Sequence, residues 1–337
     1  MKNSYIFLYY FTLIFGTLAA ISSTSWFLSW VGLEINLLAL MPLMKHLNNK
    51  FSTEATIKYF MTQALASAIF LFSSIHSSLI YELNNFELSM ISSFLMCLAL
   101  MLKIGVAPLH FWLPQVTSGL NWKLNLIILT WQKIAPMIII YNTVPYTMFF
   151  SIIIILSSII SSIQGLNQTC LRKILAYSSI NHSSWMIAAI LSSLTTWSLY
   201  FIIYFLINFS IISIFNKFNI FQMSQLNKLF SKNKMIKFIF MFNFLNLGGL
   251  PPFLGFLPKW LVIMNLTQHK LFTVATMLVI FTIITLYFYI RICLSSFSIN
   301  YEESLINSFN KMNFMSTFFN SLSLMMLMIC SLMIENI

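Results

Sequence analysis

The sequence predicts an all-α polytopic membrane protein with about eleven transmembrane helices. Apolar residue types make up 59% of its 337 residues and charged types 7%, whereas roughly a quarter of the residues of a soluble domain are charged. Its apolar runs reach about 20 residues, which is the length that crosses a bilayer. Glycine and proline interrupt two of these runs, and each interruption lies beside a lysine. Together these observations exclude a soluble globular domain and predict broken helices inside the membrane.

The predicted spans form a single membrane domain over residues 1–337. They centre on 5–21, 25–44, 56–76, 89–113, 124–140, 144–164, 174–192, 195–216, 236–265, 271–292 and 315–334. The first run lacks a small-residue cleavage site, so we expect it to be retained. The fourth and ninth runs are longer than one span needs and contain Gly and Pro, which predicts two half-helices in each. Pro136 should bend the fifth.

The two interrupted runs resemble each other. Gly105-Val-Ala-Pro-Leu-His-Phe-Trp-Leu-Pro114 matches Gly248-Gly-Leu-Pro-Pro-Phe-Leu-Gly-Phe-Leu-Pro258, with one additional residue in the second. Because they belong to the fourth and ninth spans, the repeating unit is five helices, and an odd unit inverts its second copy in the membrane. Inverted repeats with paired discontinuous helices are typical of ion-coupled transporters. We therefore predict a first inverted repeat over 1–141, a second over 142–293, and a loop and one extra C-terminal helix over 294–337.

The basic residues between the spans predict how the chain is oriented. If each run crosses once, nearly all of them fall on one side and only Lys270 on the other; the larger group is Lys2, Lys45, Lys50, Lys58, Lys123, Arg172, Lys173, Lys217, Lys228, Lys232, Lys234, Lys237, Arg291 and Lys311. The positive-inside rule places the N-terminus on that side, which in a mitochondrion is the matrix, and an odd span count puts the C-terminus across. Topology thus explains the net charge of +11, and no nucleic-acid partner is expected.

The sequence shows no motif for a bound cofactor or metal. Its four cysteines are scattered, without a CxxC pair or a histidine at ligand spacing, so neither a disulfide framework nor a zinc or iron-sulfur site is indicated. Nucleotide-binding loops and catalytic triads are also missing from the sequence. We expect no cofactor and no metal to be bound by this chain itself.

Four charged residues lie at mid-membrane depth in the apolar runs, away from the basic residues near the span ends: Glu34, Lys103, Lys133 and Lys259. An ionisable side chain at such depth costs about 3 kcal/mol or more and is a candidate functional group. Burial and a neighbouring opposite charge shift a proton affinity in opposite directions, so such a set can be tuned for proton exchange. The alternative for Lys103 is a side chain that reaches the membrane interface.

Two histidines extend this set of candidates. His182 lies in the polar patch Ser178-Ser-Ile-Asn-His-Ser-Ser184, and His110 follows the first helix interruption. Imidazole gains or loses a proton near physiological pH, which suits a proton relay. The alternative for each is a packed side chain that makes a hydrogen bond.

Four motifs carry a resemblance to a known family. They are Lys103-Ile-Gly-Val-Ala-Pro-Leu-His-Phe-Trp-Leu-Pro114, Thr130-Trp-Gln-Lys-Ile-Ala-Pro136, Arg172-Lys-Ile-Leu-Ala-Tyr-Ser-Ser-Ile-Asn-His182 and Gly248-Gly-Leu-Pro-Pro-Phe-Leu-Gly-Phe-Leu-Pro-Lys259. With them the chain resembles the antiporter-like subunit 2 family of mitochondrial NADH:ubiquinone oxidoreductase, respiratory complex I, in an insect or other arthropod form. Family core subunits have fourteen helices, and the resemblance implies that the shortfall here is at the N-terminus. Ser183 follows the histidine where relatives often have a small residue or glycine.

The resemblance implies a proton-translocating subunit of the membrane arm in the mitochondrial inner membrane. Glu34 would pair with Lys103, and Lys133 and Lys259 would continue a polar axis at mid-membrane. FMN, iron-sulfur clusters and ubiquinone would belong to other subunits, so that only the assembly is an enzyme. Expected partners are the other membrane-arm subunits and membrane lipids, with cardiolipin as a candidate. Two alternatives stay open: a subunit of a multisubunit cation/proton antiporter, and a membrane scaffold without transport.

Overall fold

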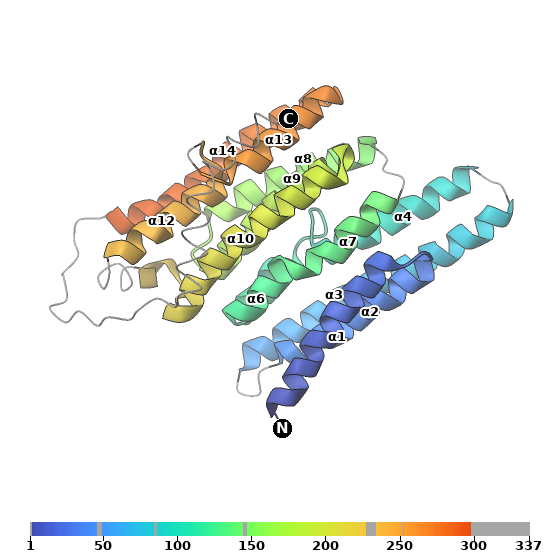
Figure 1. Cartoon of the computed structure of the whole chain (residues 1–337), viewed down its shortest axis with the longest axis horizontal. Coiled ribbons are helices and arrows are strands. Elements are labelled where there is room, and N and C mark those ends of the chain that lie inside the picture. Colours follow the sequence, from blue (N-terminus) through green and yellow to red (C-terminus); the bar gives the residue numbers. More distant parts are fainter. Residues whose placement is uncertain are drawn as a thin grey trace. The chain divides into compact units, whose positions relative to one another are not determined.

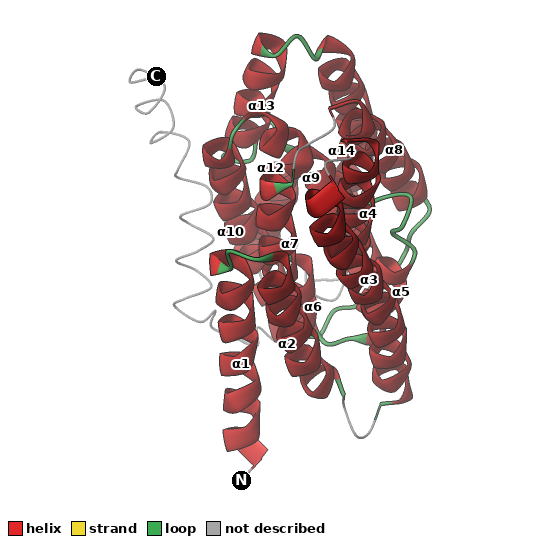
Figure 2. Ribbon diagram, turned by 90° about the vertical axis from the view of Figure 1, so that its right-hand side faces the viewer, coloured by secondary structure: helices red, strands yellow, loops and turns green. Residues whose placement is uncertain are grey.

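The computed structural model is all-helical throughout the part that it describes, namely residues 2–45, 49–83, 86–143, 147–226, 234–251 and 253–297. The chain divides into two compact units, Met1–Phe149 and Phe150–Ile337. Figure 2 draws helices joined by short connections and no strand in the described segments. The predicted all-α class is therefore confirmed, whereas the span at 315–334 lies outside the described residues.

The first unit contains seven helices within its described residues. They are α1 (Lys2–Ser22), α2 (Trp26–Met44), α3 (Lys50–Leu83), α4 (Phe86–Ile104), α5 (Trp112–Gly119), α6 (Trp122–Leu129) and α7 (Trp131–Asn142). Helix α1 packs along α2, α2 packs against α3, and α3 contacts both α4 and α5, as the blue and cyan ribbons of Figure 1 show. Helix α7 closes this unit against α4 and α1.

Helix α8 (Thr147–Leu166) starts at the end of the first unit, and most of its residues belong to the second. The other helices described there are α9 (Leu171–Ser192), α10 (Leu194–Phe218), the short η1 (Met223–Gln225), α12 (Lys234–Gly248), α13 (Phe256–Gln268) and α14 (Phe272–Phe297). Helix α9 contacts α10, α13 and α14, and its residues from Ser178 to Ile190 are buried. Its polar patch therefore faces protein and not the outside of the unit.

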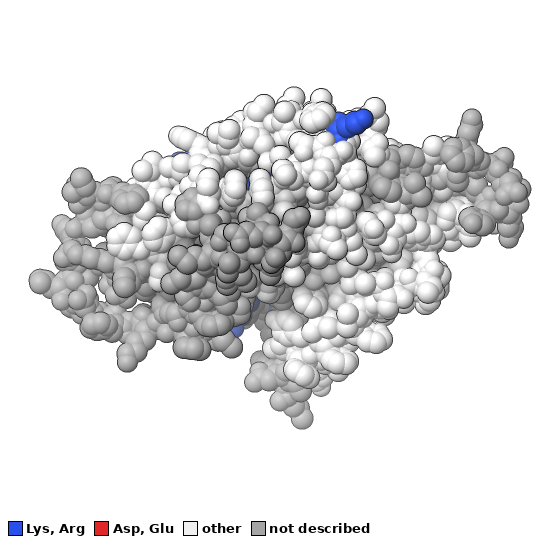
Figure 3. Space-filling view, turned by 45° about the horizontal axis from the view of Figure 1, so that its top comes forward, with Lys and Arg blue, Asp and Glu red and all other residues white. Residues whose placement is uncertain are grey.

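The outer surface is apolar. Among the described residues, seven helical stretches are long and apolar enough to cross a membrane, with α6 and α7 taken together: Tyr5–Ser22, Trp26–Met44, Lys50–Leu79, Trp122–Asn142, Thr147–Leu166, Leu194–Phe218 and Phe272–Leu294. Large side chains such as Phe7 and Ile283 are 74% and 65% exposed, and the face in Figure 3 is almost entirely free of charged atoms where residues are described. Such a surface is compatible with lipid and not with water.

The fourth and ninth predicted spans are interrupted, as the glycines and prolines indicate. Helix α4 ends at Ile104 and α5 starts at Trp112, while α12 ends at Gly248 and α13 starts at Phe256. Helix α9 is not among these seven stretches, and α5, α12 and α13, with 8, 15 and 13 residues, are each too short to span alone. The count of eleven spans and the inverted symmetry of the repeats therefore stay predictions.

Both interruptions begin with the same C-terminal cap. The N–H of Gly105 donates to the carbonyl of Leu102 and that of Val106 to Met101, at N···O distances of 3.2 and 3.2 Å. In the second unit Gly249 donates to Asn246 at 3.0 Å and Leu250 to Leu245 at 3.5 Å. This is the Schellman arrangement, which needs a left-handed residue after the helix. The φ angles of Gly105 and Gly249 are 78° and 74°, so both positions favour glycine.

The fifth predicted span differs from the expectation of one helix bent at Pro136. It is divided into α6 and α7 at Thr130, where φ is −120° and ψ is −71°. Pro136 lies inside α7, six residues after this break. Proline lacks an N–H and crowds the carbonyl four residues earlier, which for Pro136 is that of Gln132 inside α7. The interruption consequently places Lys133 in the first turn of α7.

Candidate functional site

Three buried lysines lie within one turn of a helix end. Lys103 is in the last turn of α4, Lys133 in the first turn of α7, and Lys259 in the first turn of α13. Their exposed fractions are 6%, 1% and 7%. A helix C-terminus stabilises positive charge and a helix N-terminus disfavours it. The breaks therefore give Lys103 a different electrostatic setting from those of the other two lysines.

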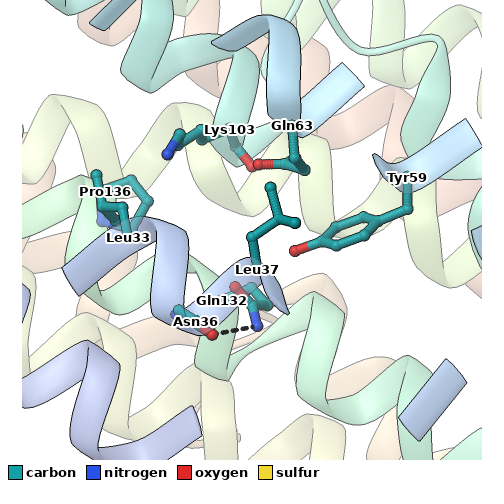
Figure 4. Close-up of a pocket in the computed structure, with 8 residues that line it drawn as sticks. All are labelled: Leu33, Asn36, Leu37, Tyr59, Gln63, Lys103, Gln132 and Pro136. Carbon is teal, nitrogen blue, oxygen red and sulfur yellow. Dashed lines mark hydrogen bonds between the residues drawn. The ribbon is translucent and has the colours of Figure 1, made fainter. Parts of the chain in front are cut away.

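Lys103 lines a small polar cavity in the first unit. The residues around it are Leu33, Asn36, Leu37, Tyr59, Gln63, Lys103, Gln132 and Pro136, contributed by α2, α3, α4 and α7. Figure 4 shows the Lys103 ammonium directed toward Pro136 and the Tyr59 hydroxyl directed inward from the opposite wall. The space accommodates about one water molecule. Amide and hydroxyl groups thus surround the lysine in an otherwise apolar interior.

Hydrogen bonds fix the walls of this cavity. Gln132 Nε2 donates to Asn36 Oδ1 at 2.8 Å, which ties α7 to α2 (Figure 4). Gln63 Nε2 lies 3.4 Å from the carbonyl oxygen of Lys103, and Trp112 Nε1 donates to the carbonyl of Leu102 at 3.0 Å. The last carbonyls of a helix lack an N–H partner within the helix. Side chains from α3 and α5 therefore supply hydrogen bonds to the carbonyls of Lys103 and Leu102 at the end of α4.

Glu34 lies beside this cavity without lining it. It is partly buried, and it interacts electrostatically with Lys103 and Tyr59. Within the described residues its Oε2 atom has no hydrogen-bond partner, and no Glu34 oxygen comes within 4.0 Å of Lys103 Nζ. The pairing that the resemblance implies is therefore a longer-range electrostatic interaction in this structure and not a contact ion pair.

His110 lies in the connection between α4 and α5. It is 1% exposed, and its Nδ1 atom is 3.3 Å from the carbonyl oxygen of Pro108. Its ring packs against Phe111 with centroids 4.4 Å apart. Neither His110 nor Lys133 belongs to the wall of the Lys103 cavity, although Gln132, the neighbour of Lys133 in sequence, does. The first unit thus brings Glu34 close to Lys103 and keeps the other two candidates outside the cavity.

Lys259 bridges the interruption of the second unit. Its Nζ atom donates to the carbonyl oxygen of Gly248 at 2.8 Å, so that α13 caps the end of α12. The ammonium also lies 6.0 Å from the ring centroid of Trp185 on α9, within reach of a cation–π interaction. His182 is one helical turn before Trp185, and its Nδ1 atom lies 2.9 Å from the hydroxyl of Tyr200. Helix α9 therefore presents one residue toward Lys259 and another toward α10.

Several residues at these sites were not identified from the sequence. Gln63, Asn36 and Gln132 could have been found, because an amide within an apolar run needs a hydrogen-bond partner inside the protein. Trp185 and Tyr200 carry no such signal, since aromatic residues are frequent in lipid-facing and core positions. Among the described residues, no group of three or more His, Cys, Asp or Glu side chains converges on a metal position.

Gly249 also leaves space for Lys259. A Cβ atom at Gly249 would lie 2.9 Å from both the Cδ and Nζ atoms of Lys259, besides requiring a positive φ. We expect Gly249→Ala to displace the ammonium from the Gly248 carbonyl and to strain the backbone by about 1 kcal/mol or more. Gly248→Ala is the control, because its nearest neighbour would be Leu286 at 3.5 Å. A cryo-EM map of each variant complex should show the lysine moved in the first only; an unmoved lysine in Gly249→Ala would contradict the packing argument.

The interrupted helices with a buried lysine at each break define a class of polytopic membrane proteins, which the comparisons identify. The family model described as NADH:quinone oxidoreductase/Mrp antiporter, TM, matches residues 23–285. Over 93% of each chain, the sequence is 49% identical to NADH-ubiquinone oxidoreductase chain 2 of Anopheles gambiae, and it is 44% identical to that of Aedes aegypti over 96% of each. The chain belongs to the NADH-ubiquinone oxidoreductase chain 2 family. The predicted resemblance, with its insect character, is confirmed.

Solved structures share the fold. Respiratory complex I from Thermus thermophilus contains a chain that matches with a TM-score of 0.83 and 22% identity, covering 96% of this chain and 79% of that one. A chain of the Mrp complex from Dietzia sp. matches with a TM-score of 0.73 and 18% identity, covering 83% and 58%. At these identities the likeness establishes the antiporter-like fold alone.

Proposed function

We propose that this chain is a proton-translocating subunit of the membrane arm of complex I, in which Glu34, Lys103, Lys133, Lys259, His110 and His182 exchange protons. The observation that carries the proposal is the placement of all three buried lysines at helix ends created by interruptions. A buried ammonium is costly, and packing alone could be achieved with an apolar side chain. The unpaired backbone groups at a helix end give a buried lysine polar neighbours. These groups interact differently with the charged and the neutral form of the lysine, and proton exchange requires that both forms be accessible.

The Lys103 cavity supports a water-assisted step in the first unit. It has room for about one water molecule between amide and hydroxyl groups. A water in this place could carry a proton between Lys103 and the polar wall, since Glu34 makes no direct contact with the ammonium. In the second unit, Lys259 and His182 would exchange protons within the polar interior beside α9. The alternative function, a membrane scaffold without transport, does not explain why these ionisable side chains are buried.

The remaining parts of the proposal follow from family membership. FMN, iron-sulfur clusters and ubiquinone would be bound by other subunits, and no cofactor by this chain. The other membrane-arm subunits and membrane lipids, including cardiolipin, would be its partners in the mitochondrial inner membrane. Identity of 40–49% to three insect chain 2 proteins favours this assignment over a cation/proton antiporter subunit. Purification through a tag on this chain should recover flavin and NADH:quinone activity; recovery of a flavin-free assembly would contradict it.

The orientation of the second unit can be tested with two exposed positions. Ser224 follows α10 on the side rich in basic residues, and Gln268 ends α13 beside Lys270. The positive-inside rule places Ser224 on the matrix side and Gln268 on the intermembrane-space side. A membrane-impermeant thiol reagent should therefore label Ser224→Cys only in inverted membranes and Gln268→Cys only in mitoplasts. Labelling of both from one side would refute the proposed topology.

A further inference from the structure

His182 faces a cluster of tyrosines that the proposed relay does not yet include. Tyr200 and Tyr204 lie one turn apart on α10 and are 1% and 2% exposed. Both contact the His182 ring, but in different ways. The Tyr200 hydroxyl lies 2.9 Å from Nδ1, whereas the Tyr204 ring packs against the imidazole with centroids 5.0 Å apart. One contact is a hydrogen bond and the other is ring packing.

The hydroxyl of Tyr204 is engaged elsewhere. It interacts with the side chain of Ser179 on α9, and Asn208 Nδ2 donates to the backbone carbonyl of Tyr204 at 2.9 Å. Tyr204 is therefore held by α9 and by its own helix, independently of the imidazole nitrogens. Of the two tyrosines, Tyr200 is the one that makes a hydrogen bond with the His182 ring.

A phenol at Nδ1 determines what an imidazole can do. Its hydroxyl donates a hydrogen bond to an unprotonated Nδ1 or accepts a hydrogen bond from a protonated Nδ1, and in both cases it fixes the ring orientation. Proton exchange with other groups then goes through Nε2. The free energy of each protonation state depends on this hydrogen bond, because bonds that favour one charge state shift the equilibrium between them.

We propose that Tyr200 is a positioning residue for proton transfer by His182: its hydroxyl orients the imidazole and sets which nitrogen exchanges the proton. The inference rests on the proposed relay function of His182. It adds to the relay a residue on α10 that carries no charge and that no motif identified. Tyr204 supplies packing to the same ring without this role, which makes the two tyrosines a matched pair.

The test uses complete reconstituted complexes with Tyr200→Phe, Tyr204→Phe, His182→Ala and Tyr200→Phe combined with His182→Ala. Tyr to Phe keeps the ring volume, so assembly on native gels should match wild type. We expect Tyr200→Phe to slow proton translocation roughly two- to tenfold, as the loss of one hydrogen bond implies, and to move its pH profile by up to about one pH unit. Tyr204→Phe should change neither, and the double variant should match His182→Ala alone.

The outcomes separate the two proposals. If His182→Ala lowers translocation while Tyr200→Phe keeps the wild-type rate and pH profile, the role of Tyr200 is wrong and the relay stands. Losses that add up in the double variant would also contradict it, because members of one unit are not additive. Normal translocation by His182→Ala would refute the relay function of His182, and the inference about Tyr200 with it.

Discussion

Lys259→Met should remove most proton translocation while the complex still assembles. Methionine keeps most of the apolar volume of the lysine stem, and only the ammonium and its bond to the Gly248 carbonyl are lost. Removal of a group that transfers protons slows a reaction by about 10²–10⁴-fold, whereas loss of one cap costs about 1 kcal/mol of stability. The measurement is dye quenching by acidified vesicles during NADH oxidation, normalised to the amount of assembled complex.

Two further variants separate charge from capping. Lys259→Gln retains an N–H donor for the Gly248 carbonyl but cannot exchange a proton, so we expect it to fail like Lys259→Met. Lys270→Met removes an exposed lysine at the turn before α14 and should translocate normally. Full activity of Lys259→Gln would show that Lys259 is a structural cap and not a proton carrier.

Lys103→Met and Glu34→Gln should each reduce translocation strongly, and together no more than the worse of the two. Glu34 interacts with Lys103 through electrostatics without a contact ion pair. Glutamine keeps the shape and hydrogen bonding of the carboxylate and removes its charge, so it tests this interaction alone. Proton affinity at Lys103 should change by about one to three pH units, the usual effect of a nearby opposite charge.

The combined variant gives the outcome that would contradict this pairing. Residues that act as one unit show non-additive losses, so vesicle acidification by the double variant should equal that of Lys103→Met. Additive losses would mean that the two residues act independently. Glu54→Gln is a suitable control, because Glu54 forms an exposed ion pair with Lys58 at 2.7 Å and should have no effect on translocation.

The helix interruptions were predictable because their chemistry is local. A glycine shortly before a proline within an apolar run favours a helix C-terminal cap and leaves backbone groups without helical partners. This effect does not depend on how the neighbouring helices pack. Gly105 and Gly249 show this at both breaks. The break at Thr130 was not predictable in the same way, because Thr130 has no unusual backbone requirement and Pro136 acts at a distance along α7.

The partners of the buried charges depend on tertiary packing and could not be predicted. Gln63 reaches the Lys103 carbonyl across 40 positions of sequence, and Lys259 reaches Gly248 across the break. The spacing of apolar residues says little about these contacts. In a membrane, the face of a helix that packs on other helices and the face that contacts lipid are both apolar. The isolated charges and the polar patch of α9 identified the candidate residues, whereas their arrangement required the structure.

The number of protons translocated per quinone reduced tests the central claim most directly. It is measured in vesicles with reconstituted wild-type, Lys103→Met and Lys259→Met complexes, at electron-transfer rates matched by the NADH supply. If the buried lysines carry protons, both variants should translocate fewer protons per quinone than the wild type at every pH. An unchanged ratio in both assembled variants would contradict the account and leave the lysines as structural elements of the broken helices.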